Sequence, residues 1–192
     1  MKKFNQNQID EIAAEFKRGG VIAVPTETVY GLAVAYDNEK AIEKLMKLKD
    51  RAPDSGKKLP LMLADSSQIG KFAIETDMSK KISGKYFPGE LTLEYQKNPN
   101  FKNIYYDNFT RFGIRIPNHD FMLRLLKKTG PLMVTSANLR GEIPAQTSDD
   151  VIKNLPEIDA TVIGVSGGHP PSTVAEIVGD KIKIHRQGSL II

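Results

Sequence analysis

Cysteine is absent from the 192 residues, which excludes a disulfide framework, a thiolate zinc site and a cysteine nucleophile. Long apolar runs are absent as well: the longest are short stretches such as 21–24, whereas a membrane-spanning helix needs about 20 apolar residues. The N-terminus has two lysines followed by polar residues instead of an apolar signal core. These absences predict a cytoplasmic protein with no membrane association.

Several common catalytic signatures are also missing. The chain has no Gly-x-x-x-x-Gly-Lys-Ser/Thr phosphate loop, no Gly-x-Gly-x-x-Gly dinucleotide fingerprint and no Gly-x-Ser-x-Gly nucleophile elbow. The three histidines, His119, His169 and His185, are far apart and lack the spacing of metal ligands. We therefore expect no metal ion held by the protein alone, and a serine hydrolase is disfavoured.

The overall composition is that of an ordinary globular protein, with 40% hydrophobic and 26% charged residues. Lysine and arginine number 27 against 23 acidic residues, which gives a net charge of +4. This small excess is compatible with phosphate-bearing partners but does not require them. The length, and the lack of an interior linker or repeat, predict one domain over residues 1–192.

Apolar periodicity and turn residues divide the chain into alternating helices and strands. Short apolar, β-branched runs predict strands at 21–26, 59–64, 91–95, 112–116, 132–135, 161–165, 173–178 and 181–186. Three/four spacing predicts helices over 9–16, 39–48, two short stretches of 66–87 divided at Gly70 and Gly84, about 121–129, and 148–155. Asn38 and either Thr147 or Ser148 are candidate helix caps. This pattern predicts an α/β fold in which helices pack on a mixed sheet.

Polar residues follow several of the predicted strands, where open α/β sheets place their ligands. The segment 25–31 holds two threonines, Glu27 and Tyr30 between a proline and a glycine. These side chains could satisfy a turn or line a site. A basic loop follows at 49–58, which could be a solvated charge run or could fold over an anion.

Arg115 lies between Ile114 and Ile116 near the end of an apolar strand. A buried guanidinium needs an anionic partner, which could be an internal carboxylate or a ligand carboxylate. Small and hydroxyl residues recur at 135–138, 167–168 and 172–173, and Arg186 adds a cation near the last strand. Together these residues predict a cleft for a polar, anionic small molecule or for a nucleic-acid backbone.

These residues also form a series that resembles the YrdC-like domain of threonylcarbamoyl-AMP synthases. The matching segments are Pro-Thr-Glu-Thr-Val-Tyr-Gly-Leu at 25–32, Lys-x-Arg at 49–51, Pro-Gly-x-Leu-Thr at 88–92, Gly-x-Arg-x-Pro at 113–117, Thr-Ser-Ala-Asn at 135–138, Ser-Thr-Val at 172–174 and Arg-x-Gly at 186–188. Their order and spacing match over most of the chain. The resemblance implies an open, twisted mixed sheet with packed helices and a basic concave face, in the short, single-domain form.

The same resemblance implies an enzyme that joins L-threonine, bicarbonate and ATP into L-threonylcarbamoyl-AMP and releases pyrophosphate. Partner proteins would then transfer the threonylcarbamoyl group to an adenosine of tRNA. Magnesium is expected to arrive with ATP, with no all-protein cage for it.

The resemblance also assigns roles to individual residues. For threonine, it implies contacts with Thr28, Ser136 and Ser172 and a pairing of its carboxylate with Arg115. Lys49 and Arg51 would be catalytic, next to the ATP phosphates. The other residues expected on the nucleotide side are Arg51, Lys58, Arg111, Asn138 and Arg186. Whether Lys57 or Lys58 faces the phosphates is open.

Two departures from the family pattern leave other interpretations open. Ala64 stands where many relatives have a histidine expected to contact threonine, and Glu90 replaces a proline and adds a negative charge near an anion site. One alternative is a module that binds tRNA or double-stranded RNA without catalysis. Another is a divergent carbamoyl-transfer paralogue that acts on a different acceptor.

Overall fold

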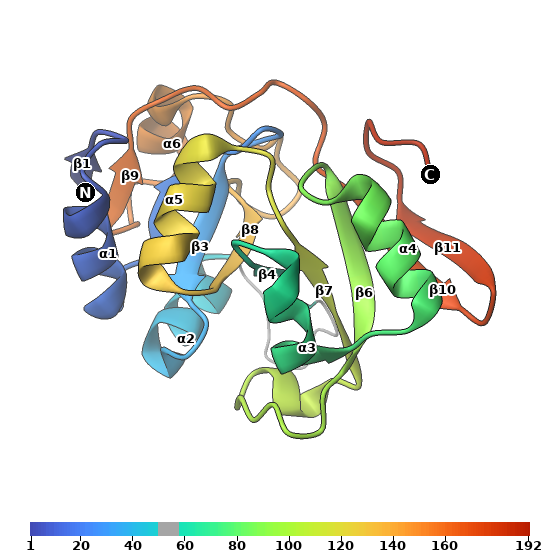
Figure 1. Ribbon diagram of the computed structural model, residues 1–192. Helices are drawn as coiled ribbons and strands as arrows, with labels where there is room; N and C mark the ends of the chain where they lie inside the picture. Colours follow the sequence, from blue (N-terminus) through green and yellow to red (C-terminus); the bar gives the residue numbers. More distant parts are fainter. Residues whose placement is uncertain (50–57) are drawn as a thin grey trace.

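The computed structural model of the chain describes residues 1–49 and 58–192 (Figure 1). Its strands form one mixed sheet in the order β1-β9-β2-β3-β8-β4-β7-β6-β10-β11, with β5 paired to β6 outside this path. The strands are β1 (Lys2–Phe4), β2 (Ile22–Val24), β3 (Gly31–Ala35), β4 (Leu61–Met62), β5 (Ala73–Ile74), β6 (Leu91–Lys97), β7 (Arg111–Arg115), β8 (Leu132–Ser136), β9 (Ala160–Val162), β10 (Thr173–Val178) and β11 (Lys181–Arg186). The helices are α1 (Ile9–Lys17), α2 (Glu39–Leu48), α3 (Ile69–Phe72), α4 (Asp77–Tyr86), α5 (Asp120–Thr129) and α6 (Ser148–Asn154).

The sheet is mixed and open, as the sequence predicts. Its parallel pairs are β1–β9, β2–β9, β4–β7 and β6–β10, and its other pairs are antiparallel. Strands β1 and β11 stand at opposite ends of this order, so the sheet formed by the described strands is open. No helix in the described residues has the length and apolar character needed to span a membrane.

Side-chain alternation along the strands divides the core into two clusters, one on each face of the sheet. In β2, Ile22 and Val24 join the cluster that includes the apolar residues of α1 and α5, while Ala23 joins the cluster that includes those of α2 and α6. Helices α1 and α5 lie side by side over one half of the sheet (Figure 1). This period of two is the pattern expected of strands buried on both faces.

Most predicted helices begin and end as expected. The Asn38 side chain caps α2 by accepting a hydrogen bond from the Ala41 N–H (3.1 Å), and Thr147 caps α6 in the same way. Gly130, with φ of 79°, ends α5. The division of 66–87 into two helices is confirmed, but the predicted breakpoints are wrong.

Gly70 and Gly84 both lie inside helices, in α3 and α4. The chain leaves the helical conformation at β5, which pairs with the end of β6. Thr76 then begins α4 with a reciprocal capping box to Ser79. Pairing and capping therefore determine the boundary, and two isolated glycines are tolerated within the helices.

Three strands lie outside the predicted set, β1, β3 and β5. Strand β3 directly follows the threonine-rich loop and pairs with β8 over its whole length, so Gly31 lies opposite Ser136. A Cβ at Gly31 would lie 2.5 Å from a methyl group of Val134, so only glycine allows this close approach. This pairing places the loop 25–30 next to the polar end of β8.

Candidate active site

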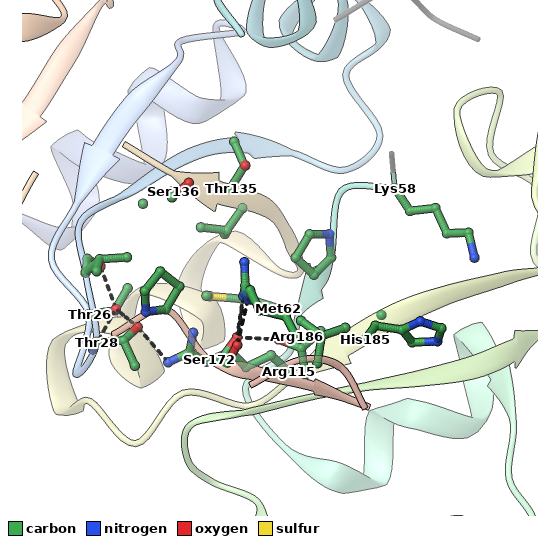
Figure 2. Close-up of a pocket in the computed structure, with 18 of the residues that line it drawn as sticks. Thr26, Thr28, Lys58, Met62, Arg115, Thr135, Ser136, Ser172, His185 and Arg186 are labelled. Carbon is green, nitrogen blue, oxygen red and sulfur yellow. Dashed lines mark hydrogen bonds between the residues drawn. The ribbon is translucent and has the colours of Figure 1, made fainter. Parts of the chain in front are cut away.

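A cavity of about 600 Å³ lies over the centre of the sheet and is lined by residues of the β2–β3 loop and of β4, β6, β7, β8, β10 and β11. Four cationic side chains line the described part of this cavity, Lys58, Arg111, Arg115 and Arg186, against two carboxylates, Glu94 and Glu176. The excess of positive charge agrees with the predicted basic concave face. Figure 2 shows Thr28, Arg115, Ser172 and Arg186 gathered around Met62, with Lys58 and His185 at the other end.

Arg115, the last residue of β7, is almost fully buried at 5% exposure. Its Nη2 atom lies 2.9 Å from the Glu27 Oε1 atom and donates a hydrogen bond to the Thr28 hydroxyl at 3.1 Å. The expected anionic partner is therefore an internal carboxylate. The Arg115 Nε atom and the Glu27 Oε2 atom are buried and have no hydrogen-bond partner among the described residues. The pair therefore has one donor, the Arg115 Nε–H, and one acceptor, the Glu27 Oε2 atom, available for a further hydrogen bond.

The loop between β2 and β3 is held by its own hydroxyl groups. The Thr26 hydroxyl donates to the Val29 carbonyl at 2.7 Å and lies 3.0 Å from the Thr28 hydroxyl. A second segment closes over the loop, because the Gly167 N–H donates to the Thr26 carbonyl at 3.0 Å. A Cβ at Gly167 would lie 1.9 Å from the Glu27 carbonyl oxygen, so this contact requires glycine.

Ser172 and Arg186 form the wall next to Arg115. The Arg186 guanidinium donates to the Ser172 carbonyl at 3.0 and 2.8 Å, and the Ser172 hydroxyl lies 2.8 Å from the Thr92 hydroxyl. Burial lowers the pKa of Arg186, and the nearby charge of Arg115 lowers it further. Both guanidinium groups line the same cavity, an arrangement that favours the binding of an anion.

Lys49 is 3% exposed and lies beside the end of β8. Its ammonium group donates to the Ser136 carbonyl at 2.9 Å, to the Asn138 side-chain oxygen at 2.8 Å and to the Asn138 carbonyl. The Ser136 hydroxyl donates to the same Asn138 side chain at 2.6 Å. Ser136 lines the cavity, whereas Lys49 and Asn138 are not among the described residues that line it. The predicted residues Arg51 and Lys57 lie outside the described residues.

The other end of the cavity is built from ion pairs. Lys58 lies 3.2 Å from Glu94, Arg111 lies 2.9 Å from Glu176, and His185 lies 2.9 Å from Glu176. Burial raises the pKa of Glu176, but the hydrogen bond from His185 and the charge of Arg111 outweigh it, and the net pKa lies below its ordinary value. Glu176 is therefore ionised at neutral pH.

Sequence reasoning did not assign Glu94 or His185 to the site. The signal for Glu94 was present, because Thr92 and Glu94 alternate with the buried Leu91, Leu93 and Tyr95 of β6. Ligand atoms of Glu94, Glu176 and His185 lie within 4.8 Å of one another, so these side chains could hold a divalent cation. A cation there would have to displace Lys58 and Arg111 from the carboxylates.

The structure corrects the expectation about Ala64. Met62 is the β4 side chain that lines the cavity, whereas Ala64 packs with Phe4 and Ile9 against the core cluster of α1 and α5. The side chain that this segment contributes to the cavity wall is therefore the thioether of Met62 and not the methyl group of Ala64.

Comparisons with known proteins agree with this arrangement. The Sua5/YciO/YrdC family model, described as "Telomere recombination", matches residues 14–188. A Methanocaldococcus jannaschii protein, provisionally named a threonylcarbamoyl-AMP synthase, is 33% identical over 186 residues, covering 96% of this chain and 87% of the relative. The threonylcarbamoyl-AMP synthase of Photobacterium profundum is 30% identical over 188 residues, covering 95% of this chain and 100% of the relative.

Solved structures show the same fold. P. abyssi Sua5 complexed with L-threonine superposes with a TM-score of 0.87 at 24% identity and covers 98% of this chain. This chain spans 57% of that longer protein. E. coli YciO superposes with a TM-score of 0.85 at 21% identity, covering 98% of this chain and 94% of its own.

Proposed function

The chain belongs to the Sua5/YciO/YrdC family, and on that premise we propose that it is an L-threonylcarbamoyladenylate synthase. The enzyme joins L-threonine, bicarbonate and ATP into threonylcarbamoyl-AMP and releases pyrophosphate. The observation that carries this proposal is the convergence of Arg115 and Arg186 with the hydroxyls of Thr28 and Ser172 in one cavity. A carboxylate and neighbouring polar groups of an amino acid fit such a set of donors and acceptors.

We propose that threonine binds at the end of the cavity formed by Thr28, Arg115, Ser136 and Ser172. Arg115 suits a carboxylate, since its buried, planar guanidinium offers donors in a fixed geometry that matches the two carboxylate oxygens. The relatives' names and the L-threonine complex of P. abyssi Sua5 support this substrate. Met62 supplies an apolar wall against which a substrate methyl group can pack.

We propose that the nucleotide occupies the rest of the cavity, toward Lys58 and Arg111. The roles toward ATP that the resemblance gives to Lys49, Arg51, Asn138 and Arg186 remain part of this proposal, although Lys49 and Asn138 contact Ser136 and Arg186 contacts Ser172 at the threonine end. Negative charge develops on the α-phosphate and on leaving pyrophosphate, and fixed cations stabilise that charge most in a site that excludes water. Holding the threonine amine, the carbon source and the phosphorus atom together supplies the remaining acceleration. Magnesium would enter with ATP and neutralise part of the phosphate charge.

The product is proposed to pass to partner proteins that modify tRNA, which places the reaction in the cytoplasm. Neither the RNA-binding module nor the carbamoyl-transfer paralogue is favoured by a specific observation on the described residues. Binding to an RNA backbone would weaken steeply with salt, whereas binding of threonine at Arg115 would not.

The test is pyrophosphate release from ATP by the purified protein with magnesium, threonine and bicarbonate, together with mass spectrometry of the product. Release should require threonine and bicarbonate, and threonylcarbamoyl-AMP should accumulate. The Photobacterium profundum synthase serves as the active control. Release that does not depend on threonine, or none while the control is active, would refute the proposal.

A further inference from the structure

Glu90 joins three segments that are distant in the sequence. It stands immediately before β6, and its carbonyl accepts a hydrogen bond from the Thr173 N–H at 3.0 Å. One carboxylate oxygen contacts the His169 Nδ1 atom, and the other accepts a hydrogen bond from the Ser189 hydroxyl. The side chain is 19% exposed and is not among those that line the cavity.

The two segments that Glu90 holds are the ones that carry Ser172 and Arg186. His169 lies three residues before Ser172, and Ser189 lies three residues after Arg186. The segments also contact each other directly, because the Gly188 N–H donates to the Thr173 hydroxyl at 2.9 Å. The same hydroxyl donates to the Leu190 carbonyl at 2.7 Å. Glu90 is thus the charged centre of a network that fixes one wall of the cavity.

We propose that Glu90 is a positioning residue, whose carboxylate holds the 169–172 loop and the 187–190 segment so that Ser172 and Arg186 face the substrate. This role adds a positioning residue to the proposed synthase reaction and rests on that proposed function. Glu90 does not touch the substrate; it acts through the two segments that it ties together. Hydrogen bonds to a charged acceptor are stronger and more directional than neutral ones, which suits a carboxylate for this task.

The electrostatic surroundings keep this carboxylate ionised. Burial raises the pKa of Glu90, but hydrogen bonds from Ser189 and His169, together with the charges of His169 and Arg115, hold it below its ordinary value. A negative charge close to Arg115 opposes the binding of another anion there. Glu90 therefore has two opposite effects on threonine binding, one through position and one through charge.

These two effects can be separated with Glu90→Asp and Glu90→Gln. Glu90→Asp keeps the charge but is too short to reach both partners, while Glu90→Gln keeps the length and loses the charge. If positioning dominates, both variants should weaken threonine binding by about tenfold, measured by calorimetry and as a rise in the KM for threonine larger than the fall in kcat. If Glu90 acts through charge alone, Glu90→Asp should resemble the wild type and Glu90→Gln should bind threonine more tightly. Either of those results overturns the proposal.

Asp10→Asn is the matched control, because Asp10 forms an exposed ion pair with Lys128 on α1 and α5, away from the cavity. Ser189→Ala, which removes one of the two side-chain contacts, is a milder variant in case the Glu90 variants do not fold. Amide hydrogen exchange at 187–190 gives a readout independent of activity. Exchange should be faster in the Glu90 variants and in Ser189→Ala and unchanged in Asp10→Asn.

These readouts also separate a failure of this inference from a failure of the proposed function. If the wild type releases no pyrophosphate in the presence of threonine but Glu90→Asp still speeds amide exchange at 187–190, the enzymatic proposal is refuted. The role of Glu90 in holding the 187–190 segment is then still supported. An active wild type whose Glu90→Asp variant has unchanged exchange and unchanged threonine affinity refutes the role of Glu90.

Discussion

The two ends of the cavity differ in the partners of their cationic side chains. At one end, Arg115 forms an ion pair with one carboxylate, that of Glu27, and donates a hydrogen bond to the neutral hydroxyl of Thr28. Arg186 at the same end donates hydrogen bonds to the carbonyl and the hydroxyl of Ser172. At the other end, Lys58 and Arg111 each face a carboxylate that also lines the cavity. The first end thus keeps one guanidinium, that of Arg186, without a carboxylate partner among the described residues, whereas at the second end both cations must exchange their ion pairs for phosphate.

The largest effect should follow from Arg115→Ala. We expect kcat/KM for threonine to fall by at least 100-fold, because the variant removes the carboxylate-binding cation. It also leaves the half-buried Glu27, 14% exposed, with the Asn118 N–H as its remaining donor among the described residues, so the free energy of unfolding should fall by up to roughly 3 kcal/mol. Pyrophosphate release and thermal unfolding measure the two consequences. Arg124→Ala, at an exposed position on α5, is the control.

A double variant separates binding from stability at the same end. Arg115→Met with Glu27→Gln should recover most of the free energy of unfolding, since no buried charge is then left alone, but should not recover threonine-dependent activity. If Arg115→Ala retained the threonine affinity of the wild type, the contrast between the two ends of the cavity would be wrong.

At the end lined by Lys58 and Arg111 we expect a smaller effect, which is tighter substrate binding instead of weaker binding. Glu94→Gln and Glu176→Gln should each lower the KM for ATP by about three- to fivefold, because they release Lys58 and Arg111 from partly exposed pairs of up to about 1 kcal/mol. ATP titrations at two salt concentrations measure the change. A higher KM for ATP would instead show that these carboxylates contribute to nucleotide binding.

The smallest effect concerns His119, a partly buried side chain whose ring interacts electrostatically with Glu27 and Asp120. Burial lowers the pKa of His119 from its ordinary value of 6.5, although Glu27 and Asp120 act in the opposite direction. A lowered pKa in the folded state means that stability is greatest above pH 6.5 and decreases as the pH falls through the lowered value. Urea unfolding at several pH values should show this decrease in the wild type, and its absence in His119→Gln would confirm the source. An unchanged pH dependence in that variant would assign the decrease to other groups.

The sequence predicted the fold well where the signal was local. The strands at 173–178 and 181–186, the Asn38 cap and the end of the helix at about 129 each depend on neighbouring residues, and each is confirmed. Strand β3 was missed although it pairs with the neighbouring β2 as well as with the distant β8, because Gly31–Ala35 contains a glycine and two alanines, which have low strand propensity. The break between α3 and α4 was misplaced because β5 exists only through its pairing with β6.

The site was predictable in its residue types but not in its pairings. The cost of burying a guanidinium showed that Arg115 needs an anionic partner, yet nothing local to Arg115 identifies Glu27. Resemblance located Thr28, Ser136, Ser172 and Arg186, and the structure places all four at the cavity. Met62 and Ala64 could not be told apart without the register of the short strand β4. The roles given to Lys49, Arg51 and Asn138 stay predictions.

The parallel pairing of β6 with β10 has a consequence for the order in which the molecule is completed on the ribosome. Strand β6 leaves the exit tunnel about 80 residues before its partner, so one long edge of the sheet stays open during that interval. The same holds for β1, which waits for β9. Since Ser172 and Arg186 are among the last residues to emerge, a nascent chain has most of its sheet before it has a complete substrate pocket, and ligands cannot assist the earlier steps of folding.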